Sequence, residues 1–152
     1  MIKDELFYIK HINCLLSSNL NNLLNEYDIT FQQSHVILYL IKHKDEDINQ
    51  KRIEKAFGLK PSTVSGIIDR LRNKGFISKN KVENDGRNNY LFVTEKGLNL
   101  YDTLENNRKY INSEIFKDFT LEEKEKLNIY LEKMNDNLMN IGKENNIWLK
   151  HY

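Results

Sequence analysis

The sequence of 152 residues predicts a mainly α-helical fold of the α+β class, with a small β-hairpin among the helices. Apolar residues recur at steps of three and four over most of the chain, which is the spacing of one buried helical face. Residues 76–82 and 90–93 alternate apolar and polar side chains around a segment rich in Asn, Asp and Gly, as a hairpin does. Charge is uneven as well: residues 48–90 hold ten Lys and Arg against four Asp and Glu, a net charge of +6, while the rest carries −5. This asymmetry favours a polyanionic partner, with a chance cluster on a solvated surface as the alternative.

Two helices are predicted in the N-terminal part of the chain. The first spans residues 4–27, and its apolar stripe comprises Ile9, Ile12, Leu16, Leu20, Leu23 and Tyr27. The second begins at Thr30, because Gln33 three residues later completes a capping box, in which each side chain accepts a hydrogen bond from the other residue's backbone N–H. Its expected buried face is Val36, Ile37, Leu40 and Ile41.

Two shorter helices are predicted in the central, basic part. An extended piece near Ile48 leads to a third helix over residues 50–57, which Gly58 ends. Pro61 suits the first turn of a fourth helix, where its missing N–H costs nothing. Gly75 closes that helix ahead of the hairpin. The core positions of the fourth helix are Val64, Ile67, Ile68 and Leu71.

Long helices are predicted again in the C-terminal part. Thr94 can cap a fifth helix that reaches about Lys117, and Thr120 with Glu123 forms a second capping box at the start of the last helix. The apolar stripe of the last helix has the steps of a helix that packs along another helix: Leu127, Leu131, Met134, Leu138 and Ile141. It could cover the chain's own first helix, but long amphipathic helices at both ends favour a dimer.

A short helix followed by a basic hairpin is the arrangement of a winged helix-turn-helix, whose helix fits a DNA major groove and whose hairpin reaches the next minor groove. The small outward residues expected to approach the base edges are Pro61, Ser62, Thr63, Ser65 and Gly66. The basic residues expected to contact phosphates are Arg70, Arg72, Lys79 and Lys81. At the hairpin tip, Arg87 suits a narrow minor groove and Asp85 can hold its guanidinium, with a plain surface ion pair as the alternative.

One part of the chain resembles the wing of the MarR family of bacterial transcription regulators, namely Asp85-Gly86-Arg87 followed by Leu91, Val93, Thr94 and Gly97. The segment PSTVSGIIDRLRNKGFI is similar to that family's recognition helix, with matching residues at Thr63, Val64, Ile68, Leu71 and Gly75. The likeness covers essentially the whole chain. Pro61 and Gly66 depart from the family pattern and leave fewer side chains for reading bases.

The resemblance implies a dimeric, sequence-specific regulator, in most cases a repressor, that binds an inverted-repeat operator in double-stranded DNA. It implies that residues 1–29 and 99–152 form a helical dimerisation domain and residues 30–98 the DNA-binding domain. It further implies release by a small anionic or aromatic effector bound between these domains. Candidate effector residues are His11, His35, Tyr39 and Tyr101, each of which could instead be an ordinary packed or surface residue.

Other kinds of function have less support in the sequence. Cys14 could sense peroxide as some MarR proteins do, but a packing role is favoured because no Lys or Arg occurs in the next two turns. The four histidines are too scattered for a metal site, no cofactor is implied, and the phosphate loops and nucleophile motifs of enzymes are missing.

No apolar run is long enough to cross a membrane, and a single cysteine suits the cytoplasm. A winged helix that binds only proteins remains the alternative, but it would be expected to show an apolar patch on its fourth helix.

Overall fold

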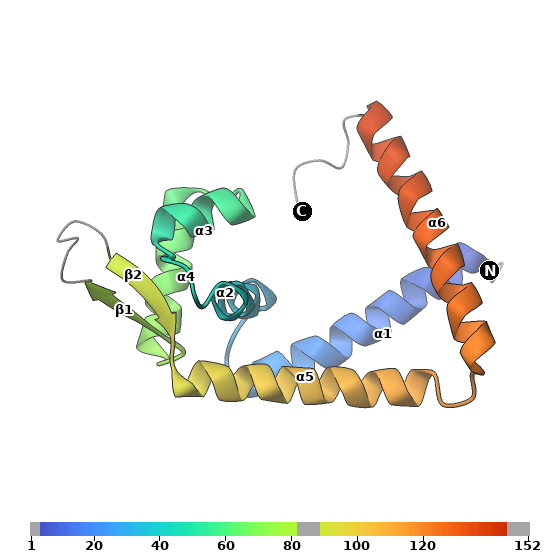
Figure 1. Ribbon diagram of the computed structural model, residues 1–152, viewed down its shortest axis with the longest axis horizontal. Coiled ribbons are helices and arrows are strands. Elements are labelled where there is room, and N and C mark those ends of the chain that lie inside the picture. The colour runs from blue at the N-terminus through green and yellow to red at the C-terminus, as the bar shows by residue number, and fades with distance from the viewer. Residues whose placement is uncertain (1–3, 82–88, 146–152) are drawn as a thin grey trace.

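The computed structural model describes residues 4–81 and 89–145, which form six helices and one two-stranded sheet. Three short helices and the sheet make a lobe at one end, from which α1 and α5 extend as long arms that diverge away from the lobe (Figure 1). The helix α6 begins after the far end of α5 and runs at a steep angle to it (Figure 1). In chain order the elements are α1 (Glu5–Glu26), α2 (Phe31–Lys42), α3 (Gln50–Phe57), α4 (Pro61–Asn73), β1 (Ile77–Lys81), β2 (Asn89–Val93), α5 (Glu95–Ile115) and α6 (Leu121–Asn145).

The helix starts follow the predicted caps. The Thr30 backbone N–H donates to the Gln33 side chain over 3.0 Å, and the Gln33 N–H donates to the Thr30 hydroxyl over 3.3 Å, so the capping box of α2 is confirmed. The box at Thr120 and Glu123 is formed in the same way, and Glu123 accepts the Thr120 N–H over 2.8 Å. The Thr120 hydroxyl also donates to the same carboxylate over 2.9 Å, and these two hydrogen bonds from Thr120 hold the pKa of the Glu123 carboxyl below its ordinary value.

The lobe surrounds one hydrophobic core to which every predicted apolar position of α4 contributes. Val64, Ile67, Ile68 and Leu71 are all buried. They pack with buried residues of the other elements, namely Leu24, Ile29, Val36, Ile37, Leu40, Ile48, Ile53, Phe76, Ile77, Leu91 and Leu100. The predicted face of α2 is confirmed for three positions, while Ile41 is only half-buried. A shared core of this kind fixes the orientation of α4 relative to α2 and the sheet.

The sheet is an antiparallel pair in which Ile77 faces Val93 and Lys79 faces Leu91. The segment before α3 pairs with the free edge of β2, because the Leu91 N–H donates to the Ile48 carbonyl over 2.8 Å. The predicted hairpin is therefore confirmed in its two strands. Its turn, residues 83–88, lies outside the described residues.

The start of α5 packs tightly against the base of this hairpin. The Thr94 hydroxyl donates to the Gly75 carbonyl over 2.6 Å, and the Thr94 N–H donates to the Phe76 carbonyl over 3.1 Å. One turn into the helix, an added Cβ at Gly97 would lie only 2.5 Å from both the Phe76 carbonyl oxygen and a Val93 methyl group. Only a glycine allows this close approach between α5 and the hairpin.

The long helices leave much apolar surface uncovered. The second half of α1 packs on the lobe through Leu24, but Ile12 and Leu16 in its first half are 50% and 41% exposed. On α6, Leu138 is 58% exposed, and Leu131, Met134 and Ile141 are exposed with it. Across the described residues, α6 has no extended contact with α1 or with any other helix. The alternative that α6 covers the chain's own first helix is therefore wrong.

Among the described residues, no helix combines the length and the apolar character that a membrane span requires.

Candidate nucleic-acid interface

The outward face of α4 carries the small polar residues that the sequence predicts for base reading. Pro61 is the first residue of the helix. The opposite face of α4 is buried in the core, so Ser62 and Thr63 are exposed to solvent. Ser65 and Gly66 are half-buried, one turn further along. Space around Gly66 is open, because apart from its neighbours and the backbone of its own helix no described atom lies within 4 Å of an added Cβ. The side chains on this face are thus small enough to let the α4 backbone approach the floor of a DNA groove closely.

Two arginines on the second half of α4 differ in their surroundings. Arg72 lies 3.6 Å from Asp69, one turn away, in an exposed pair that contributes little to stability. Arg70 is exposed and has no acidic partner among the described residues. An unpaired guanidinium on this face remains available to an external anion.

A lysine that follows α4 has a structural role instead. The Lys74 ammonium lies 2.9 Å from the Asp28 carboxylate and also donates to the Asp28 carbonyl, which joins the end of α4 to the α1–α2 junction. Asp28 has a left-handed backbone with φ of 52° at this junction. Lys74 therefore adds to the charge of the lobe without being free for DNA.

The hairpin residues are described only in part. Lys79 on β1 is exposed, and no acidic partner occurs for it within the described ranges. Lys81 ends β1, and its side chain lies outside the described part of the chain, as do Asp85 and Arg87. The expected phosphate contact of Lys81 and the expected minor-groove role of Asp85 and Arg87 stay predictions.

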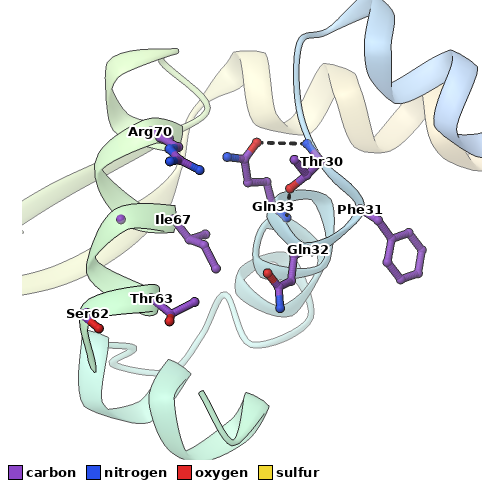
Figure 2. Close-up of a pocket in the computed structure, with 9 residues that line it drawn as sticks. Thr30, Phe31, Gln32, Gln33, Ser62, Thr63, Ile67 and Arg70 are labelled. Carbon is purple, nitrogen blue, oxygen red and sulfur yellow. Dashed lines mark hydrogen bonds between the residues drawn. The ribbon is translucent and has the colours of Figure 1, made fainter. Parts of the chain in front are cut away.

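A cavity of about 600 Å³ lies between the outward face of α4 and the first turn of α2. Figure 2 shows Thr63, Ile67 and Arg70 directed from α4 toward α2, and Gln32 on the α2 side of the same space. The complete lining is Thr30, Phe31, Gln32, Gln33, Ser62, Thr63, Gly66, Ile67 and Arg70. Sequence reasoning missed the α2 wall of this cavity. The capping box places Gln32 in an exposed first turn, but its spacing does not reveal which helix lies opposite.

The four candidate effector residues are spread over three helices. His11 is exposed on α1 and stacks on Phe7, with 5.8 Å between the ring centroids. His35 is exposed on α2 against Phe31, whereas Tyr39 packs on His43 and Tyr101 is half-buried on α5. None of the four lines the cavity beside α4 or a second hollow of about 210 Å³ between α2, β2 and α5. The effector role of these residues stays a prediction.

The second hollow has apolar walls and a charged rim. His43 Nδ1 lies 2.6 Å from the Glu46 carboxylate, to which Arg52 also donates. The pKa of Glu46 lies below its ordinary value because of the hydrogen bond with His43, followed by that with Arg52. The group is exposed, so this network fixes the α2–α3 loop more than it stabilises the fold.

Cys14 corrects an expectation drawn from the sequence. Its predicted packing role is wrong for the single chain, because Cys14 is exposed on the first half of α1. The lack of nearby cations in the sequence favours packing, but the first half of this helix extends beyond the lobe (Figure 1).

Comparisons with known proteins agree with this geometry. The family described as Transcriptional regulator SarA/Rot matches residues 19–104. The HTH-type transcriptional regulator SarZ of Staphylococcus haemolyticus is 29% identical over 106 residues, which cover 70% of this chain and 68% of that protein. SarZ of Staphylococcus aureus strain USA300 is 27% identical over 120 residues, covering 79% and 76%. The crystal structure of an S. aureus MepR–DNA complex superposes with a TM-score of 0.77 at 25% identity, covering 85% of this chain and 96% of that one. The reported relatives are transcription regulators and not enzymes, and the MarR-like winged helix-turn-helix fold is confirmed.

Proposed function

This chain belongs to the SarA/Rot family of transcriptional regulators, and we propose that it works as a homodimer that binds an inverted-repeat operator in double-stranded DNA. In this proposal it represses transcription in the cytoplasm and leaves DNA when a small molecule binds. The base-reading residues are Pro61, Ser62, Thr63, Ser65 and Gly66 on α4, and the phosphate contacts are Arg70, Arg72, Lys79 and Lys81.

The main support for this proposal is the set of residues on the outward face of α4. It presents hydroxyl groups, a glycine and Arg70, which has no acidic partner among the described residues, and such groups suit base edges and phosphates. A winged helix that binds proteins would instead need an apolar patch at this place. The MepR complex with DNA, at 25% identity, supports the same use of this fold.

The dimer is supported by the apolar surface that the long helices leave exposed. We propose that residues 1–29 and 99–152 of two chains form one dimerisation domain and that residues 30–98 form each DNA-binding lobe. Two lobes related by a twofold axis would then meet successive major grooves, about 34 Å apart. The wing would place Arg87, supported by Asp85, in the adjacent minor groove.

Substitutions on α4 and on β1 should separate base reading from positioning. Thr63→Ala removes a hydroxyl from the major groove and is expected to reduce the preference for operator over random DNA. Lys79→Ala is expected to weaken binding to both DNAs alike and to reduce the salt slope by about 1. Titration of both duplexes across a salt gradient measures these effects. A Lys79 variant that lost more operator preference than the Thr63 variant would contradict the placement of α4 in the major groove.

The release signal is proposed to be a small aromatic or anionic molecule that binds near His11, His35, Tyr39 and Tyr101. Such a molecule must bind the form that does not fit DNA more tightly, and tenfold discrimination corresponds to about 1.4 kcal/mol. The exposure of Cys14 supports oxidation of this thiol as a second candidate signal, because reaction with peroxide requires access.

Cys14→Ser distinguishes the two signals. Under the proposed ligand switch, the variant and the parent should bind the operator equally and should respond equally to salicylate and to mild peroxide. The measurement is operator affinity of both proteins with each compound. Release by peroxide that occurs in the parent and disappears in Cys14→Ser would establish a thiol switch instead.

A further inference from the structure

The cavity beside α4 has the chemistry of a site for a sugar–phosphate strand. Thr63 and Arg70 supply a hydroxyl group and a cation on the α4 wall, and Gln32 supplies a carboxamide on the α2 wall (Figure 2). Ile67 also lines the cavity, although its side chain is largely buried in the core. None of the residues that line the cavity is acidic.

Two polar side chains of this cavity, Gln32 and Arg70, make no contact that holds the described part of the fold together. Among the described residues, neither the Gln32 carboxamide nor the Arg70 guanidinium has a side-chain hydrogen bond or an ion pair. The start of α2 is already satisfied by the reciprocal bonds of Thr30 and Gln33, so Gln32 is not needed as a cap. Its side chain is therefore available to a ligand that enters from outside.

The position of the cavity suggests which ligand that is. It adjoins the face of α4 that carries the proposed base-reading residues Ser62, Thr63 and Gly66. When a helix occupies a major groove, a backbone strand runs along each of its sides, and a preceding helix can cross one of these strands. The first turn of α2 borders the cavity on one side of α4, while the β-hairpin lies on another side of α4 (Figure 1).

We propose that this cavity seats the backbone of one DNA strand and that Gln32 of α2 is a direct phosphate contact, together with Arg70 of α4. The inference rests on the proposed DNA-binding function and adds α2 to the DNA-contacting elements. Gln32 positions the lobe on the duplex and does not read sequence, because phosphates are alike at every base pair.

A charge series at position 32 tests this proposal in the full-length protein. Gln32→Glu should weaken binding roughly tenfold, to operator and random duplex alike, because a carboxylate replaces a donor beside a phosphate. Gln32→Lys should strengthen binding at low salt and steepen the salt slope by about 0.9 for each protomer. The thermal midpoint of Gln32→Glu should be unchanged or slightly raised, because an acidic residue in the first turn of a helix is favourable. Weaker binding by a protein of equal or greater stability cannot be attributed to misfolding.

Asn106→Asp is the matched control, since it makes the same amide-to-acid change at an exposed position in the middle of α5. Light scattering should show the same oligomeric state for the control, the parent and the Gln32 variants. A second measurement uses duplexes with single neutral methylphosphonates. One such replacement should weaken binding by the parent and should have no cost for Gln32→Glu.

The outcomes separate this inference from the function on which it rests. If the parent binds duplex DNA but Gln32→Glu loses no more affinity than Asn106→Asp, the role of Gln32 is wrong and the proposed function stands. If the Gln32 variants change operator preference and not overall affinity, α2 faces base edges and the phosphate assignment is wrong. If the parent binds no duplex at all, the proposed function itself fails.

Discussion

Deleting residues 121–152 is expected to leave a monomeric or aggregating protein whose DNA-binding lobe still folds. The helix α6 contributes nothing to the described core of the lobe, so its removal should preserve the burial of residues such as Phe76 and Leu71. It does remove the exposed apolar stripe that includes Leu131 and Leu138. A monomer holds one half-site at a time, so operator affinity should fall by roughly 10²–10⁴-fold.

A pair of substitutions on α6 tests the same dependence without truncation. Leu138→Asp places a charge in the stripe and should dissociate the dimer, because an unpaired charge in an apolar interface is costly. Asn140→Asp makes a similar addition on the polar side of the helix and should leave the dimer intact. Both positions are exposed in the single chain, so neither change should unfold it. Light scattering gives the mass, and a dimeric Leu138→Asp protein would contradict the proposed interface.

Gly97→Ala is expected to destabilise the lobe and to misplace the hairpin. The new methyl group would lie 2.5 Å from the Phe76 carbonyl oxygen and from a Val93 methyl group. A backbone oxygen cannot move aside as a flexible side chain can, so α5 and the hairpin must separate. Overpacking of this kind costs about 1–3 kcal/mol. The free energy of unfolding from urea denaturation measures this cost, and operator binding should weaken as well.

Gly66→Ala is the matched control in α4, because it also adds one methyl group to a helical glycine. The added Cβ would have open space outside the backbone of its own helix, so the change should stabilise the helix by up to about 1 kcal/mol. Its DNA affinity should fall only if α4 approaches the groove floor closely. Equal unfolding free energies for the parent and Gly97→Ala would show that α5 can shift from the hairpin at no cost.

Helix boundaries and the core of the lobe follow from the sequence. Thr30 with Gln33 and Thr120 with Glu123 form the predicted capping boxes, because the atoms that bond are only three residues apart. The four apolar positions of α4 are buried, because helical periodicity places them on one face whatever lies opposite. The resemblance to MarR proteins, carried by the recognition helix and wing residues, likewise depends on local spacing.

Only the tertiary structure decides what each face meets. Periodicity alone does not show that Cys14 lies on a part of α1 beyond the lobe, or that most of the α6 stripe is exposed in the single chain. It also does not place Gln32 opposite Arg70, or Gly97 against the Phe76 carbonyl group. These facts depend on how elements cross that are tens of residues apart in the sequence. A residue's spacing therefore determines its helix and its face, while the packing of distant helices determines whether that face is buried, bound to DNA or left for a second chain.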